Sequence, residues 1–298
     1  MDRTDLVIFS RLVANPFLSD ESLGREVGLT GKAARLRRKR METQGVIAEY
    51  GIHPAAETLG RHAVVRRYGG KPWTRLPASR LSEVEDLVCV MSFRPALHRV
   101  VRFTEEAEPP EDPRLARILG PPLGGAPGEP PPPSVDPRDR LSLVDWRVLE
   151  AVVAAPRASY SVKARTARLS ARTVRVHQAK LDSTHALQCA MVLNLERETG
   201  LATYGIWLKV DASFDERSIE LPRLWDRPHW TDHPRGVYLL GSAESYFEAR
   251  ALELRLRELP GVVGADPLIP AGGLFLRERL LSWIRAEREK QFGPRRDD

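Results

Sequence analysis

Residues 26–45 read EVGLTGKAARLRRKRMETQG, and this stretch decides the fold. Gly28 is a typical left-handed end for one helix, and Thr30 is a typical N-cap for the next, which we expect to run to about Gln44. Such a helix can enter the major groove of duplex DNA, although a basic helix face that meets only solvent is also common. It carries six cations in nine positions, Lys32, Arg35, Arg37, Arg38, Lys39 and Arg40.

The flanking residues complete a three-helix module. The stretch from Asp5 to Ala14 has apolar residues on one helical face and ends at Asn15-Pro16. Ser19 or Asp20 can cap a second helix, and Val46-Ile47 begins a strand after the third. Three helices with a short turn between the second and third, followed by a strand, are typical of a winged helix-turn-helix.

The module is repeated in the second half of the chain. A shift of 140 residues places Asp5 on Asp145, and apolar and cap residues then match at this constant offset. We interpret this as an ancient tandem duplication. The second copy of the basic helix, with Ser170 as its expected cap, is less charged, so it either reads bases with fewer phosphate contacts or serves only in packing. Its polar residues include Arg172, Thr173, Arg175, His177, Gln178 and Lys180.

Residues 1–52 resemble the N-terminal module of the Lrp/AsnC (feast/famine) family of transcription regulators. The resemblance is carried by Asn15-Pro16, Glu26-Val27-Gly28-Leu29-Thr30, Lys39-Arg40-Met41-Glu42 and Gly45-Val46-Ile47, and residues 141–187 share it through Leu169-Ser170, Arg172-Thr173-Val174-Arg175 and Lys180-Leu181. It implies binding to double-stranded DNA. It also implies a following βαββαβ domain that dimerises and often binds a small effector such as an amino acid.

The chain departs from the family pattern at two positions of each third helix. Arg38 and Gln178 stand where the family is usually aliphatic, whereas Leu36 and Val176 are apolar where the family tends to be polar. Because both copies show the same exchange, we expect either a rolled helix or a helix that meets a partner surface.

We therefore predict an α+β protein with two winged helix-turn-helix modules, each followed by a small ferredoxin-like (RAM-type) αβ domain, the C-terminal one trimmed by about a strand. The predicted parts are module one at 1–52, the first αβ domain at 53–104, a linker at 105–138, module two at 139–190, and the second αβ domain with a C-terminal helix at 191–298. Eleven of the 24 prolines fall between Pro109 and Pro137, which is typical of a semi-rigid spacer. Its stretch Arg114–Leu119 can form a short docked helix.

The two αβ domains also have predicted elements. In the first, Val88–Phe93 and His98–Phe103 are expected to form a hairpin. In the second, we expect a helix from Phe214 to Leu224 and a strand that runs through Ile269.

Other features limit the location and the ligands. The sequence holds 46 Lys and Arg against 40 Asp and Glu, which permits a polyanionic partner without requiring one. The isolated cysteines Cys89 and Cys189 indicate buried thiols in a reducing compartment, and the absence of a signal peptide or long apolar run predicts a cytoplasmic protein. By analogy with the family, an effector would contact Gly241, Ser242, Glu244 and Tyr246, although an ordinary turn explains these residues equally well.

Catalytic motifs are missing from the sequence. It contains no phosphate-binding loop, nucleophile elbow or metal-spaced His and Cys cluster, and His229 with His233 is more simply a loop pair. We therefore predict no enzyme activity, no cofactor and no metal. Two alternatives stay open, namely a winged-helix scaffold that binds another protein and a porphyrin enzyme resembling siroheme decarboxylases, which share the two-part architecture.

The leading hypothesis is a sequence-specific, duplex-binding transcription regulator, acting as a pseudo-dimer within one chain or as a homodimer. Thr30 and Ser170 cap its recognition helices. The predicted groove contacts are Lys32, Arg35, Arg172, Thr173 and Arg175, and the predicted phosphate contacts are Arg37, Lys39, Arg40 and Lys180.

Overall fold

The computed structural model describes residues 2–70, 77–94, 97–123, 141–184, 186–189, 192–193, 202–215, 225–226, 231–232, 236–243 and 245–293. The first module consists of α1 (Arg3–Ala14), α2 (Asp20–Val27) and α3 (Gly31–Thr43). The side chains of Asp2, Ser19 and Thr30 cap these helices by accepting hydrogen bonds from backbone N–H groups of the first turn. Gly28 ends α2 with a φ of 69°, as the sequence predicts.

The second module has the same layout: α6 (Leu143–Ala154), α7 (Tyr160–Ala167) and α8 (Ala171–Ser183). Its N-caps, Ser142, Ser159 and Ser170, lie 140 residues after those of the first module. Arg168 ends α7 with a φ of 56°, the left-handed conformation that Gly28 adopts in the first copy. The predicted α+β class with two winged helix-turn-helix modules is confirmed.

One sheet contains strands from both halves of the chain. Its order is β10-β11-β8-β12-β4-β5-β3, with β9 (Trp225–Asp226) paired to β11. The sheet is joined by the 14-residue strand β12 (Val262–Phe275), which pairs first with β8 (Ala202–Val210) and then with β4 (Leu87–Arg94). β12 passes from β8 to β4 between Leu268 and Ile269, and a register shift near Gly272, which has a φ of 126°, interrupts the pairing with β4. The sequence predicted a strand that runs only through Ile269. The residues of β12 after Ile269, which pair with β4 and so join the two halves, were therefore not predicted.

The remaining strands of the sheet include the predicted hairpin. β3 (His62–Gly69) and β5 (Leu97–Thr104) pair antiparallel, and β5 also pairs with β4 as the predicted hairpin. At the other side lie β10 (Thr231–Asp232) and β11 (Gly236–Ala243).

Two small two-stranded sheets also connect the two halves of the chain. β1 (Ile47–Glu49) pairs with β7 (Val192–Leu193), and β2 (Ile52–Pro54) pairs with β6 (Leu187–Cys189). The wing strands of each module therefore pair with those of the other module. Because each strand has only two or three residues, the pairs depend on packing against the modules and the main sheet for their stability.

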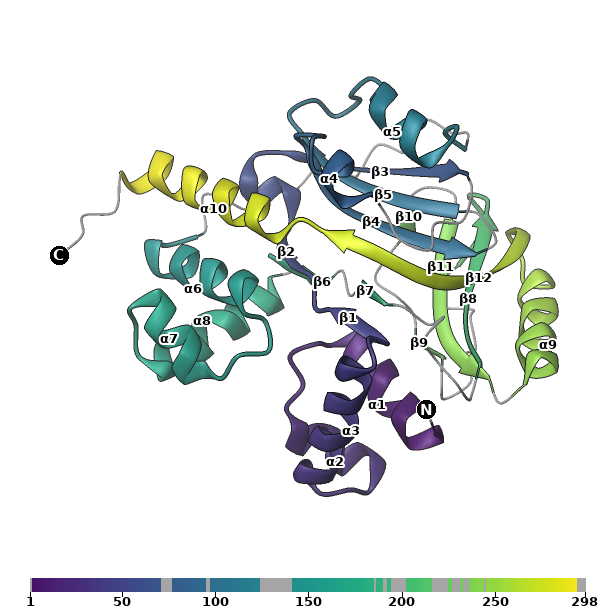
Figure 1. The fold of residues 1–298 in the computed structure, drawn as a ribbon, viewed down its shortest axis with the longest axis horizontal. Helices are drawn as coiled ribbons and strands as arrows, with labels where there is room; N and C mark the ends of the chain where they lie inside the picture. The colour runs from purple at the N-terminus through teal and green to yellow at the C-terminus, as the bar shows by residue number, and fades with distance from the viewer. Residues whose placement is uncertain are drawn as a thin grey trace.

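The two faces of the main sheet have different coverings (Figure 1). On one face, α4 (Ala78–Leu81) and α5 (Pro113–Leu119) cover β3, β4 and β5, while α9 (Tyr246–Arg257) covers β8 and β11. α5 is the docked helix predicted within the proline-rich segment. On the other face, Met91 and Trp207 share a core with the first module, and Cys89 and Phe103 share a core with the second.

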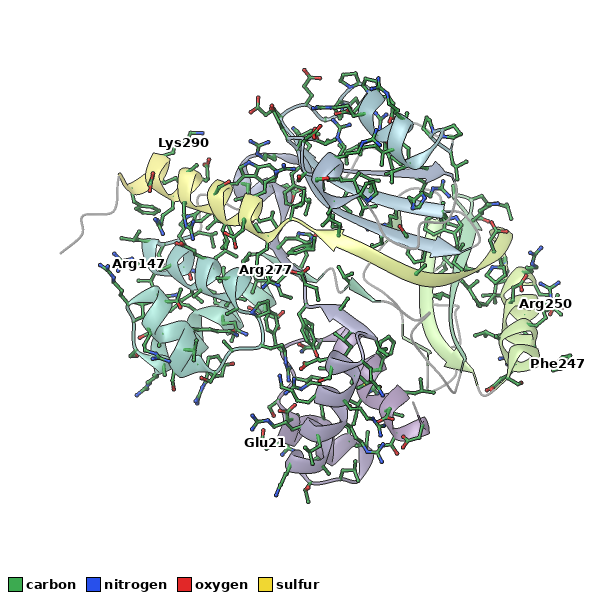
Figure 2. All side chains as sticks on the ribbon, viewed as in Figure 1. Glu21, Arg147, Phe247, Arg250, Arg277 and Lys290 are labelled. Atoms are coloured by element: carbon green, nitrogen blue, oxygen red, sulfur yellow. The ribbon has the colours of Figure 1, made fainter. Side chains whose placement is uncertain are left out.

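The last helix, α10 (Arg277–Phe292), docks on the second module. Glu150 of α6 accepts hydrogen bonds from Arg285 at 2.7 Å and from Arg288, and Trp146 Nε1 donates to Gln291 Oε1 at 3.1 Å. Figure 2 shows Arg277 at the start of this helix, between the second module and the sheet. There its guanidinium donates to Glu49 Oε1 at 2.8 Å and to the carbonyl oxygens of residues 50 and 154, so it contacts both modules.

Some predictions fall on residues outside the described ranges. These are residues 124–138 of the linker and most of the helix expected over 214–224. The described 3-10 helix η1 (Ala56–Leu59) connects β2 to β3. None of the helices in the described ranges is long and apolar enough to cross a membrane.

Candidate nucleic-acid interface

The third helices of the two modules bury equivalent faces. Ala34, Arg38 and Met41 of α3 are buried, and the matching residues of α8 are Val174, Gln178 and Leu181. Arg38 occupies the inward position in which the family is usually aliphatic. The helix is therefore not rolled. The residues on the opposite, exposed face are Lys32, Arg35, Leu36 and Lys39 in α3, and Arg172, Arg175, Val176 and Ala179 in α8.

Arg38 is buried as a fully paired cation. Its guanidinium donates to both carboxylate oxygens of Asp20, at 2.8 and 2.9 Å, and to Glu42 Oε1 at 2.5 Å. Burial alone lowers the pKa of an arginine, but here the two carboxylates outweigh it and raise the pKa. Tyr50 donates its hydroxyl to the same Glu42 at 2.9 Å. Arg38 is therefore part of the internal structure of the first module.

In each module, a buried aspartate on the first helix pairs with cationic side chains of the third helix. Asp5 accepts from Arg37 at 2.9 Å and from Arg40, and Arg37 also donates to Asp2 at 2.6 Å. The hydrogen bonds to Arg37 hold the pKa of Asp2 below its usual value. These two arginines, predicted to contact phosphates, thus also stabilise the contact between α3 and α1.

The second module repeats this arrangement with different cations. Asp145 accepts from Lys180 Nζ at 2.6 Å and lies 2.7 Å from His177 Nδ1. Burial raises the pKa of a carboxyl group, but these two partners outweigh it and lower the pKa of Asp145 to about 2. Lys180, a predicted phosphate contact, is therefore already ion-paired, with 44% of its side chain exposed.

Four of the five predicted groove residues lie on the exposed faces, and Thr173 is half-buried. Lys32, Arg35 and Arg172 form no ion pair with any residue of the described ranges. Arg175 is exposed beside the ring of Tyr160, 5.3 Å from its centroid. Thr173 Oγ1 lies 2.8 Å from the cap hydroxyl of Ser170.

The other predicted residues serve at the helix start or in a local pair. Thr30 Oγ1 accepts from the backbone N–H of Ala33 at 3.2 Å, which caps α3. Lys39 lies 2.9 Å from Glu42 and is 58% exposed, so this surface pair leaves most of its side chain in solvent.

A junction between the modules was missed from the sequence. Arg157, in the turn after α6, donates to the carbonyl oxygens of Pro16 and Leu18 at 2.6 Å and to Asp20 Oδ1 at 3.3 Å. Its guanidinium also lies 5.7 Å from the centroid of the Tyr50 ring. A lone arginine in a turn carries no sequence signal for such a contact, because its partners are more than 100 residues away. The junction fixes α3 and α8 relative to each other.

A buried polar cluster on the main sheet was also missed. Arg67 of β3 lies directly opposite Arg99 of β5, and its guanidinium is 4.6 Å from the centroid of the Trp207 ring. Trp207 Nε1 is buried and has no hydrogen-bond partner among the described residues. Nearby, burial and the positive charge of Arg99 lower the pKa of His53 to about 4. A signal was available, since Arg99 stands among apolar residues within the predicted hairpin strand.

The predicted effector residues are only partly described. Gly241 and Ser242 lie on β11, where they pair with Tyr204 and Thr203 of β8, and Tyr246 begins α9. Glu244, His229 and His233 lie outside the described residues. Cys89 is buried as predicted, which raises the pKa of its thiol to about 11. Within the described ranges, no three His, Cys, Asp or Glu side chains are grouped so that they can hold a metal ion.

Comparison with known proteins gives a partial relationship to regulators. No family model matches the chain. A segment of 62 residues is 40% identical to the uncharacterized HTH-type transcriptional regulator YezC of Bacillus subtilis (strain 168), covering 21% of this chain and 45% of that protein. The match thus spans less than half the length of this curated relative. The chain is similar to a helix-turn-helix transcriptional regulator over this segment.

Solved structures of two kinds show similarity to the fold. The siroheme decarboxylase NirDL is 9% identical, with a TM-score of 0.42, and covers 96% of this chain and 99% of its own. The transcriptional regulator NMB0573 of Neisseria meningitidis, solved with L-Met, is 22% identical, with a TM-score of 0.26 over 36% of this chain and 72% of its own. The likeness to a decarboxylase contradicts the prediction that the chain is not an enzyme, and that prediction is withdrawn.

Proposed function

We propose that the chain is a sequence-specific, Lrp/AsnC-type transcription regulator that binds double-stranded DNA through α3 and α8. The observation that carries this proposal is the pair of exposed cationic faces, centred on Arg35 and Arg175, on equivalent helices of two joined modules. Exposed Lys and Arg neutralise phosphates, and the major groove admits a helix of this kind. The 62-residue similarity to a helix-turn-helix regulator supports the same function.

The joined modules also favour a pseudo-dimer as the binding unit. Homodimeric helix-turn-helix proteins place two recognition helices on two half-sites of one duplex. Here the wing pairs β1–β7 and β2–β6, together with Arg157, hold two such helices in one chain. We propose a cytoplasmic protein that meets an operator of two unequal half-sites, because α3 and α8 expose different side chains.

Duplex binding across a salt series tests this function. Affinity should fall linearly on a log–log plot with salt, with a slope of about −0.9 for each phosphate contact. The double variant Lys32→Ala/Arg35→Ala should bind more weakly and discriminate less between sequences, because both residues are predicted groove contacts. The matched control is Arg255→Ala, because Arg255 is exposed on α9, outside both modules. Absence of binding by the unmodified protein at about 50 mM salt contradicts the proposal, because non-specific phosphate contacts alone should register there.

The buried cluster on the sheet favours a second candidate, binding of a carboxylate-bearing small molecule. Two arginines on adjacent strands and the indole N–H of Trp207, which has no partner among the described residues, supply positive charge and a donor at one place. Guanidinium groups suit carboxylates because they donate two parallel hydrogen bonds. An amino-acid effector and a porphyrin with acidic side chains both carry carboxylates of the kind that these arginines would bind.

Titration calorimetry with amino acids, and absorbance titration with an iron uroporphyrin, distinguish the two ligands. Binding of either that is lost in Arg99→Gln supports the cluster as its site. Arg114→Gln is the control, because Arg114 is an exposed arginine on α5. Retention of full affinity in Arg99→Gln shows that the ligand binds elsewhere.

A further inference from the structure

Each recognition helix exposes a branched aliphatic side chain at the same position. Leu36 of α3 is 64% exposed and Val176 of α8 is 59% exposed. A single exposed aliphatic residue is ordinary on a protein surface. Two at equivalent positions, on the helix faces proposed to meet DNA, indicate a shared role in the two modules.

The surroundings of both residues point to one occupant. One helical turn before and after Leu36 stand Lys32 and Arg40, and the same neighbours of Val176 are Arg172 and Lys180. Each apolar group is thus flanked along its helix by two cations. An apolar protein surface would strip water from Lys32 and Arg172, which form no ion pair with a described residue, whereas a nucleic acid offers phosphates on both sides of its base edges.

We propose that Leu36 and Val176 contact the methyl groups of thymines in the major groove, one in each half of the bound site. The thymine C5 methyl is the apolar group that the major groove presents, and aliphatic side chains on recognition helices can contact it. This inference rests on the proposed DNA-binding function and names the bases that the two helices select. The flanking cations hold the helix on the backbone, while the aliphatic group distinguishes thymine from the other bases.

Replacing thymine by deoxyuridine tests the inference, because deoxyuridine lacks only the methyl group. A preferred duplex is first selected from a random pool with the full-length protein, and each thymine is then replaced singly. We expect one position in each half at which the substitution weakens binding about fourfold, the effect of removing one buried methyl group. Leu36→Ala should abolish the discrimination in one half only, and Val176→Ala in the other half only.

A control and two opposing outcomes complete the experiment. Leu254→Ala should keep both discriminations, because Leu254 is an exposed aliphatic residue of α9. If the protein binds DNA but both alanine variants retain the full preference for thymine, the inference is wrong while the DNA-binding function stands. If the unmodified protein binds no duplex, the DNA-binding function fails as well, and the aliphatic faces belong to a protein partner.

Discussion

Arg157 and Phe17 occupy equivalent positions, 140 residues apart, and each side chain reaches into the other module. Arg157 donates to two carbonyl oxygens of the turn that contains Phe17. Phe17 in turn packs against the core of the second module, with Lys163 Nζ 5.5 Å from its ring centroid. A duplicated turn has therefore diverged into a polar contact and an apolar contact across the same junction.

Replacement of Arg157 should weaken this junction strongly. In Arg157→Met, two carbonyl oxygens and the carboxylate of Asp20 lose a buried partner. Breaking a buried charged contact in this way costs about 3 kcal/mol of unfolding free energy. Urea unfolding measures the loss, and Arg165→Met, an exposed arginine of α7, should stay within about 0.5 kcal/mol of the unmodified protein. Equal midpoints for the two variants contradict a structural role of the junction.

Two arginines of α3 should separate folding from DNA binding. Arg37 forms ion pairs with Asp5 of α1 and with Asp2, the N-cap of that helix. Arg37→Ala should therefore lower the unfolding free energy by about 1–2 kcal/mol. Arg35 is exposed and has no ion pair with a described residue, so Arg35→Ala should change stability by less than about 0.5 kcal/mol but weaken duplex binding. Thermal unfolding and binding isotherms of both variants test this. Unchanged stability in Arg37→Ala, or unchanged affinity in Arg35→Ala, contradicts the division.

The helices could be predicted from the sequence because their signals are local. Caps and apolar periodicity identified α1 to α3 and α6 to α8 to within a few residues, and the stretch from Pro113 to Leu119 was recognised inside the proline-rich segment. The β4–β5 hairpin was also predicted, because its two strands are adjacent in the chain.

Contacts across the two halves could not be predicted in the same way. That β12 pairs with both β8 and β4, and that Arg67 therefore lies over Trp207, depends on registers between distant strands. The basic helix α3 also looked more available to DNA than it is. Its partner Asp5 lies on α1, where its spacing marks it only as a capping residue.

Lys163 should make stability depend on pH above neutrality. This lysine is buried, and burial with the nearby charge of Arg157 lowers its pKa to about 8 from 10.5. Between these two pKa values the unfolded chain binds more protons than the folded chain. The free energy of unfolding should therefore rise with pH, by about 2 kcal/mol from pH 7 to 9.5. Tyr50 and Tyr68 have raised pKa values, so their effect falls above pH 10.

Urea unfolding of the protein and of Lys163→Met at several pH values tests this dependence. Lys163 Nζ donates to Gln178 Oε1 at 3.1 Å, so the variant also loses this hydrogen bond, but its methionine does not titrate. The difference in unfolding free energy between the two proteins should therefore change with pH. A constant difference from pH 7 to 9.5 contradicts a lowered pKa at this lysine.

Asp145 should produce a dependence of the same sign at acid pH. Its pKa is about 2 in the folded protein against 3.8 for a free side chain, because Lys180 and His177 bind the carboxylate. A carboxyl group with a lowered pKa stabilises the fold fully above the unfolded value, and this contribution disappears as the pH falls toward 2. Asp145→Asn should therefore reduce the unfolding free energy by about 2 kcal/mol at pH 7 and progressively less below pH 4. Denaturation at pH 7, 4 and 3 measures the difference, and Asp182→Asn, an exposed residue of α8, serves as the control. A deficit in Asp145→Asn that is as large at pH 3 as at pH 7 shows that the aspartate acts through its shape and its cap to Ser142 rather than through its charge.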